Sequence, residues 1–131
     1  MVKIGARELA AVAIGGALGA VCRYLLSGLV PQVRGFPMGT VLVNVLGSFV
    51  LGFLTWSTML GLRLSPEVRA LATVGFCGGL TTLSTMAYET VELLKASPVL
   101  SILYLTANVV LGIAAVLGGM AAAHVVWSGR A

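Results

Sequence analysis

The chain has 131 residues, of which 59% are hydrophobic and only 9% are charged, and its formal net charge is +4. A soluble domain carries roughly 25% charged residues, so these side chains are too few to cover a water-facing surface, and the mean hydropathy of +1.06 points the same way. The composition excludes a soluble globular domain and predicts an all-α integral membrane protein.

Four apolar segments are long enough to cross a bilayer: residues 9–30, 41–60, 68–94 and 99–127. A helix rises about 1.5 Å per residue, so about 20 residues cross a hydrocarbon core of ~30 Å. The connections between these segments are short. We therefore expect one transmembrane domain over residues 1–131, inserted in the cell membrane with four spans.

The first span carries Gly15, Gly19 and Arg23 on one helix face, at intervals of four residues. Small residues at this spacing let two helices approach closely in lipid, so packing is the predicted role of the two glycines. Arg23 lies near the end of the span, where its long side chain can reach the interface. From the residues alone, Arg23 either binds anions at the mouth of a pore or anchors the helix at the interface.

Polar side chains recur at helical spacing in the other three spans. They are Thr40, Asn44 and Ser48 in the second span, Thr81, Ser84, Thr85 and Tyr88 in the third, and Tyr104 and Asn108 in the fourth. Such groups often hold neighbouring helices together, but three stripes in one chain predict a narrow polar track through the protein. A cation pathway normally offers a buried carboxylate. Because the acidic residues lie before the first or the third span or towards the end of the third, and none at mid-membrane depth, the track favours a small anion.

The third span contains the stretch GFCGGLTTLSTMAYE, residues 75–89. Glycine costs about 1 kcal/mol relative to alanine inside a helix, and hydroxyl side chains compete for backbone hydrogen bonds. The stretch therefore predicts a break in the helix between Gly78 and Thr82. Broken backbone is tolerated in a membrane only inside protein or beside water, and its free carbonyl groups can bind a cation. The alternative is an unbroken helix with a closely packed glycine face.

The positive charges are distributed almost evenly across the predicted membrane. One side has Lys3, Arg7, Arg63, Arg69 and Arg130, and the other has Arg23, Arg34 and Lys95. Cytoplasmic loops normally carry a clear excess of Lys and Arg. So small a bias is compatible with insertion in both orientations, which would permit an antiparallel dimer, and equally with one fixed topology.

Three stretches of the chain resemble the Fluc (CrcB-type) fluoride channel family: GGALGAVCRYLLS in the first span, PMGTVLVNVLGS in the second, and GFCGGLTT followed by ST in the third. The resemblance covers essentially the whole chain. It implies a passive channel that lets cytoplasmic fluoride escape and so confers fluoride resistance. It also implies a dual-topology antiparallel homodimer with two pores lined by both chains.

The resemblance implies site residues as well. A structural sodium ion at the centre of the dimer would be held by the backbone carbonyl groups of Gly78 and Thr81, and Arg23 would lie in the anion vestibule. The implied pore residues are Asn44, Thr82, Leu83, Ser84, Thr85, Met86, Tyr104 and Asn108. Leu83 and Met86 depart from the family pattern, which has phenylalanines there, whose electropositive ring edges are thought to contact fluoride. Phe49, Phe53 or Tyr88 could substitute, or the track could work through hydroxyls and Asn44. The chain could also pair with a different, phenylalanine-bearing subunit.

Two other functions compete with the fluoride channel. A four-span proton-coupled exporter would need a glutamate embedded in the first span, whereas this chain has Glu8 before that span and Arg23 near its end. A non-conducting structural subunit finds its support in Leu83 and Met86. The sequence shows no nucleotide-binding motif, catalytic triad or metal-binding cluster, so we expect neither an enzyme nor a nucleic-acid partner.

Overall fold

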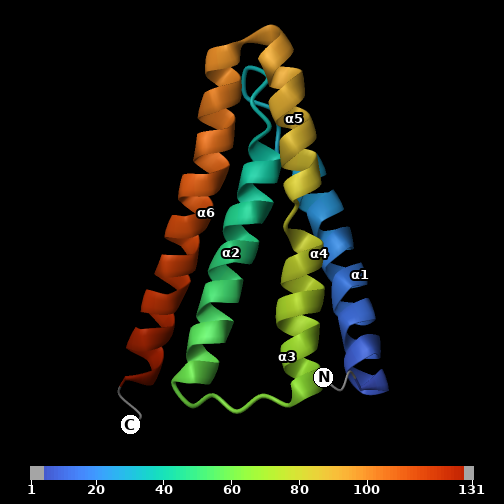
Figure 1. Ribbon diagram of the computed structural model, residues 1–131, viewed down its shortest axis with the longest axis vertical. Helices are drawn as coiled ribbons and strands as arrows, with labels where there is room; N and C mark the ends of the chain where they lie inside the picture. Colours follow the sequence, from blue (N-terminus) through green and yellow to red (C-terminus); the bar gives the residue numbers. More distant parts are fainter. Residues whose placement is uncertain (1–4, 129–131) are drawn as a thin grey trace.

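The computed structural model describes residues 5–128, which form four long helical segments (Figure 1). They are α1 (Ala6–Leu29), α2 (Met38–Met59), a third segment made of α3 (Pro66–Arg69), η1 (Ala70–Cys77), α4 (Gly78–Leu80) and α5 (Leu83–Ala96), and α6 (Pro98–Trp127). Within these residues, four helices are long and apolar enough to cross a membrane. The predicted class is confirmed, and the chain is a multi-pass membrane protein. Two of the charges counted above, Lys3 and Arg130, lie outside the described residues.

Serine–proline pairs mark the start of the third and fourth segments. The Ser65 hydroxyl accepts a hydrogen bond from Val68 N at 3.3 Å, and the Ser97 hydroxyl accepts one from Leu100 N, also at 3.3 Å. Each serine is followed by a proline in the first helical position, where the missing N–H costs nothing. These caps explain why both helices begin before their apolar residues do.

Glycine faces bring α1 and the third segment together. A Cβ added to Gly15 would lie 2.9 Å from Phe76 N, and one added to Gly19 would lie 2.9 Å from Leu80 N. On the opposite helix, a Cβ on Gly79 would lie 3.1 Å from Ala20 N. The predicted packing role of Gly15 and Gly19 is confirmed, and their partner is the third span of the same chain.

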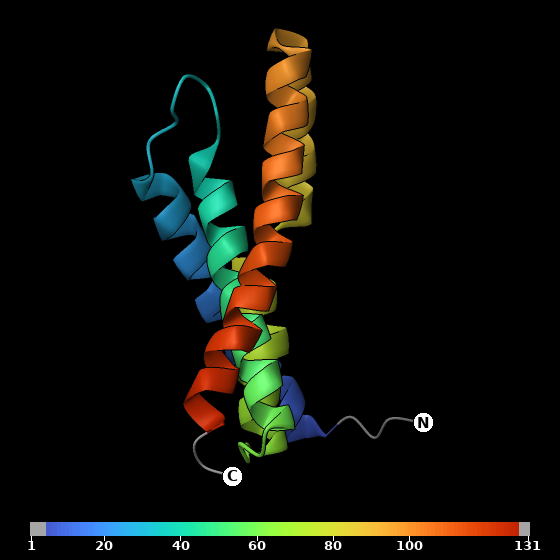
Figure 2. The same cartoon turned by 90° about the vertical axis from the view of Figure 1, so that its left-hand side faces the viewer.

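A second helix pair is formed by α2 and α6, which lie side by side in both cartoon views (Figures 1 and 2). Here too glycine allows the close approach. A Cβ added to Gly52 would lie 3.0 Å from Val116 Cα, and one added to Gly119 would lie 2.7 Å from Phe53 N. The molecule therefore consists of two tightly packed pairs, α1 with η1 and α4, and α2 with α6, while α5 packs on α6.

The third segment is broken after a stretch of π-helix, η1. Thr81 (φ −80°, ψ 155°) and Thr82 (φ −150°, ψ 116°) are both extended, and the α-helix resumes at Leu83. The predicted break is confirmed. Its cause differs from the expected one, because Gly78 and Gly79 are helical. Gly79 serves the contact with α1, and the chain unwinds at the two threonines instead.

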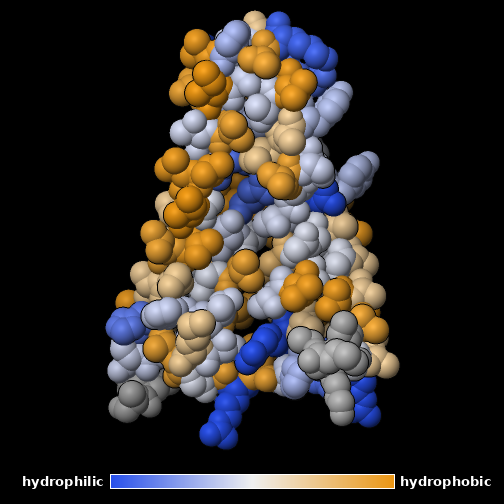
Figure 3. Space-filling model, viewed as in Figure 1, coloured by the Kyte–Doolittle hydropathy of each residue, from blue (hydrophilic) through white to orange (hydrophobic). Residues whose placement is uncertain are grey.

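The outer surface of the bundle suits lipid. Along α6, Leu103, Ile113 and Leu117 are each more than half exposed. Figure 3 shows apolar side chains over much of this side of the molecule, with strongly hydrophilic ones at its two ends and in the hollow between the helices. That hollow leads to the break in the third segment.

Candidate ion site at the break in the third span

Asn44 of α2 binds the unwound backbone. Its Oδ1 accepts a hydrogen bond from Thr82 N at 2.8 Å, and its Nδ2 donates to Thr82 O at 3.4 Å. A break in a membrane helix leaves such backbone groups without intrahelical partners, and each unpaired group costs free energy in a medium of low dielectric constant. The side chain of Asn44 therefore stabilises the extended conformation of Thr82.

The second and fourth spans meet through a chain of polar groups. Asn44 Nδ2 also donates to Asn108 Oδ1 at 2.9 Å, and Asn108 Nδ2 donates to Tyr104 O at 3.1 Å. The hydroxyl of Tyr104 donates to Glu89 Oε2 on α5. Asn108 and Tyr104 are buried, at 5% and 0% exposure. The polar stripes predicted on separate spans thus form one connected network, and the carboxylate of Glu89 joins a track expected to carry neutral groups.

Hydroxyl groups cluster where α5 begins. Thr82 Oγ1 caps the helix by accepting a hydrogen bond from Thr85 N at 3.2 Å, and it donates to Thr85 Oγ1 at 3.0 Å. Ser84 Oγ lies 3.4 Å from the same oxygen. All three hydroxyl groups can donate a hydrogen bond to an anion, and the N-terminus of the helix adds a partial positive charge.

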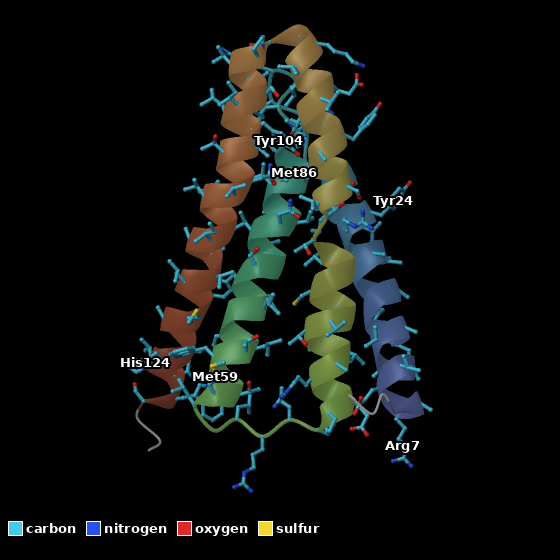
Figure 4. All side chains as sticks on the ribbon, viewed as in Figure 1. Arg7, Tyr24, Met59, Met86, Tyr104 and His124 are labelled. Atoms are coloured by element: carbon cyan, nitrogen blue, oxygen red, sulfur yellow. The ribbon has the colours of Figure 1, made fainter. Side chains whose placement is uncertain are left out.

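Arg23 of α1 reaches the break from the other side. Its Nε donates to Gly79 O at 3.0 Å. The same arginine borders a groove that also contains Ala20, Tyr24, Ser27, Gly28, Thr82 and Thr85. Figure 4 shows Tyr24 on α1 close to the level of the break. Of the two roles left open by the sequence, this position beside the hydroxyl cluster favours the anion-binding one.

The two backbone carbonyl groups predicted to bind sodium differ in their surroundings. Gly78 is exposed, and a Cβ added to it would meet nothing within 4 Å. Thr81 begins the extended stretch, and both its N–H and its hydroxyl donate to Cys77 O, at 3.0 and 2.9 Å. Carbonyl oxygens at unwound helix ends are the kind of ligand that sodium takes in membrane proteins. Thr81 is extended and suits this role, whereas Gly78 is helical, and sodium binding by the pair stays a prediction.

The two positions that depart from the family pattern differ in burial, although both border the same groove. Leu83 is 74% exposed, whereas Met86 is 9% exposed and packs in a cluster with Val41, Leu93 and Tyr104. Figure 4 shows Met86 and Tyr104 in the upper half of the molecule, between α5 and α6. Met86 therefore lies beside the polar network, and Leu83 faces outward.

The aromatic side chain nearest the network is one that the sequence analysis missed. The ring centroid of Phe36 lies 5.3 Å from that of Tyr104, with the rings at 81°. Of the candidates considered from the sequence, Tyr88 is 67% exposed, Phe49 packs against Gly118 and Gly119 of α6, and the backbone of Phe53 also faces Gly119. Phe36 lies in a loop, where helical periodicity gives no signal for a contact with a buried residue.

A groove runs along the broken segment between α2, η1 and α5, with a volume of about 380 Å³. Its lining includes Asn44, Ser48, Gly78, Thr81, Thr82 and Leu83. It continues towards Arg69 as a second hollow that shares Leu51, Thr73 and Val74 with the first. The groove therefore extends along one side of α2, from the network to the connection that follows α2.

Comparison with known proteins agrees with this architecture. Residues 10–120 match the family described as CrcB-like protein, Camphor Resistance (CrcB). The chain is 51% identical over 104 residues to the "Fluoride-specific ion channel FluC" of Pyrococcus furiosus, covering 79% of this chain and 85% of that protein. It is 46% identical over 110 residues to the protein of the same name from Thermococcus kodakarensis, covering 83% and 89%.

A third relative of the same name, from Thermococcus onnurineus, is 41% identical over 114 residues, covering 86% of this chain and 93% of that protein. The family match spans most of the chain, and these relatives are ion channels, so the expectation that the chain is not an enzyme is confirmed. The chain belongs to the CrcB-like family of membrane proteins.

Proposed function

We propose that this chain is a fluoride channel that works as an antiparallel homodimer in the cell membrane. The names of its relatives support the ion, and the connected network from Asn44 to Tyr104 carries the proposal structurally. Hydrogen fluoride is a weak acid that crosses membranes in neutral form and dissociates inside the cell. A passive pore then lets the trapped anion leave down its electrochemical gradient, without nucleotide or proton coupling.

Asn44 suggests how fluoride enters the network. Both hydrogens of its amide group are already donated, one to Asn108 and the other to Thr82 O. The bond to Thr82 O is the longer one, at 3.4 Å, and hydrogen bonds weaken as they lengthen. Fluoride, a strong acceptor, displaces this carbonyl group from Asn44 Nδ2. The hydroxyl groups of Thr82, Ser84 and Thr85 supply further donors beside it.

Arg23, Leu83 and Met86 complete the pathway. Arg23 borders the groove that leads to Thr82 and Thr85, and its charge raises the local concentration of anions there. Leu83 and Met86 supply the apolar wall at the positions where the family has phenylalanines. In this chain the donors are therefore amides and hydroxyls, with the exposed Leu83 available to contact the second copy.

The groove along α2 supports the presence of a second copy. Thr81 and Thr82 are only partly buried and Ser84 is exposed within one chain, although extended backbone in a membrane must be covered by protein or water. An inverted copy seated in the groove covers the break and brings two breaks together at the dimer centre. The small bias of positive charge permits both orientations.

The carbonyl groups of Gly78 and Thr81 from both copies then hold one sodium ion at that centre. A ligand that binds only the folded protein raises its melting temperature as its concentration increases. We expect sodium to raise the melting temperature of the purified protein and potassium at equal ionic strength to leave it lower. Equal melting temperatures in the two salts would remove sodium from the proposal.

Fluoride efflux from liposomes containing the purified chain alone is the decisive experiment. Liposomes loaded with potassium fluoride and supplied with a potassium ionophore should release fluoride to an external electrode, while parallel liposomes retain chloride. Release of both ions contradicts the selectivity. Release of neither, from protein shown to be folded and dimeric, contradicts the homodimeric channel and points to a second, phenylalanine-bearing subunit.

The antiparallel arrangement has its own test. Arg63 lies exposed in the connection after α2, so a cysteine introduced there, in a variant with Cys22 and Cys77 changed to alanine, reports the side on which that connection lies. Antiparallel insertion predicts that a membrane-impermeant thiol reagent labels about half of the protein in intact cells. Labelling of nearly all or nearly none contradicts it.

A further inference from the structure

The loop between α1 and α2 places an aromatic ring against the buried Tyr104. We propose that Phe36 is a positioning residue of the conduction path, which holds the ring of Tyr104 so that its hydroxyl stays on Glu89. This inference rests on the proposed fluoride channel and adds to it a residue outside the four spans.

The backbone fixes Phe36 from both sides. Phe36 N donates to Val33 O at 2.9 Å, and Val33 N donates to Phe36 O at 3.3 Å. The two residues between them, Arg34 (φ 51°) and Gly35 (φ 81°), are both in the left-handed region, as in the tight mirror-image turns of hairpins. Met38 N also donates to Phe36 O, at 2.9 Å. The loop therefore presents Phe36 in one defined position.

The ring of Phe36 points inward, unlike the loop residues that precede it. Residues 31–35 are exposed, whereas Phe36 is half-buried and packs against the cluster that contains Tyr104 and Met86. The rings of Phe36 and Tyr104 meet at 81° with their centroids 5.3 Å apart, which is the favoured edge-to-face arrangement of aromatic pairs. A perpendicular neighbour of this kind opposes rotation of the tyrosine ring.

Tyr104 depends on such a neighbour. It is fully buried, its hydroxyl donates to Glu89, and its carbonyl oxygen accepts a hydrogen bond from Asn108, which leads on to Asn44. Met86 in the same cluster is an unbranched side chain with three rotatable bonds, which adapts its shape to its surroundings. Among the described residues, Phe36 supplies the one aromatic ring that packs against Tyr104, and this rigid ring restricts the tyrosine more than the flexible Met86 does.

The first test measures the motion of Tyr104 without reference to transport. Tyr24 and Tyr88 are exposed, at 80% and 67%, so changing both to phenylalanine leaves Tyr104 as the only tyrosine of the chain. Solid-state NMR of this protein with a ring-labelled tyrosine should show slow ring flips. We expect Phe36→Leu, which keeps an apolar side chain without a ring, to speed the flips at least tenfold. Unchanged flip rates would overturn the proposal.

The second test asks whether Phe36 acts on transport through the hydroxyl of Tyr104. In the liposome assay, we expect Phe36→Leu to lower fluoride efflux by about 3- to 10-fold and Tyr104→Phe to lower it by a similar factor. Because both remove the same hydroxyl–carboxylate contact, the double variant should be no slower than Tyr104→Phe alone. Effects that multiply would show that Phe36 acts independently and would overturn the inference.

The turn supplies a matched pair of variants that leaves both rings intact. Gly35 has positive φ and open space around it. Asparagine tolerates this conformation and a β-branched residue does not. Gly35→Asn should therefore keep normal efflux, and Gly35→Val should reproduce the effect of Phe36→Leu. Equal efflux from the two Gly35 variants contradicts the role of the turn. Absence of fluoride efflux from the unmodified protein refutes the proposed function alone, because the NMR measurement still tests the ring contact.

Discussion

The amide group of Asn44 binds both backbone polar groups of Thr82, accepting from its N–H at 2.8 Å and donating to its carbonyl oxygen at 3.4 Å. A side chain of the second span thereby holds the extended conformation of the third. The same amide is a donor to the anion in the proposed pathway. In the proposed function, the residue that stabilises the break is therefore also the residue that binds fluoride.

Asn44→Ala should reduce both stability and transport. It leaves the N–H of the partly buried Thr82 without its partner, and an unpaired polar group removed from water costs up to about 1–3 kcal/mol. Asn108→Ala is the matched control, since it removes one acceptor from Asn44 and leaves both bonds to Thr82 in place. We expect the melting temperature in detergent to fall further for Asn44→Ala than for Asn108→Ala. We expect the fluoride efflux of Asn44→Ala to fall more than tenfold. Equal melting temperatures would contradict the role of Asn44 as the partner of the break.

Glycine packing between the first and third spans gives a second prediction. In Gly19→Ala the new Cβ would lie 2.9 Å from Leu80 N, a backbone atom that cannot move aside alone. Such overpacking costs about 1–3 kcal/mol. Gly28→Ala, in the same helix with nothing within 4 Å, should be neutral or slightly stabilising, because alanine is the better helix former. Comparison of the two melting temperatures tests this.

Gly78→Ala tests whether the glycines of the third span cause the break in the helix or serve helix packing. Gly78 is helical (φ −65°, ψ −34°), and a Cβ there would meet nothing within 4 Å. If the break were produced by flexible glycines, alanine would disturb it. We expect instead that the monomer fold tolerates the change, with circular dichroism and melting close to those of the unmodified protein. A large loss of helix content would instead show that the glycines cause the break.

The sequence predicts the features that depend on regular spacing. Intervals of four residues place Asn44, Asn108 and Tyr104 on helix faces, and these residues do meet. It could not separate two uses of a glycine, because close packing and unwinding both require a missing Cβ. The break lies at Thr81 and Thr82 because Asn44, distant in sequence, satisfies the freed backbone. Phe36 was missed for a similar reason, since a loop contact with Tyr104 follows no local period.

Arg23 should control access of anions more than the chemistry of the pore. Its Nε donates to Gly79 O, which leaves the other nitrogens of the guanidinium group for the groove. Lysine keeps the charge without the planar fork of donors, and glutamine keeps a donor without the charge. We expect Arg23→Gln to lower efflux about 3- to 10-fold, mostly at low fluoride, and Arg23→Lys to lower it less. Identical effects of both variants at all concentrations would contradict an electrostatic role.

Leu83 and Met86 should respond differently to phenylalanine, although both stand at family phenylalanine positions. Leu83 is 74% exposed, so Leu83→Phe has space and should leave the melting temperature of the single chain almost unchanged. Met86 is 9% exposed among Tyr104, Val41 and Leu93, where a rigid ring must displace its neighbours at a cost of about 1–3 kcal/mol. Methionine at this position therefore fits a cluster against which the ring of Phe36 already packs.

Efflux measurements on the same two variants decide whether ring edges are needed at all. A positive ring edge attracts an anion, so a pore that relies on such edges should conduct faster with Leu83→Phe. We expect a change of less than about threefold, because the proposed donors are the amide of Asn44 and the hydroxyls of the break. The unmodified chain could instead be silent and conduct only after Leu83→Phe and Met86→Phe are combined. That result would identify the chain as a subunit that normally pairs with a phenylalanine-bearing partner.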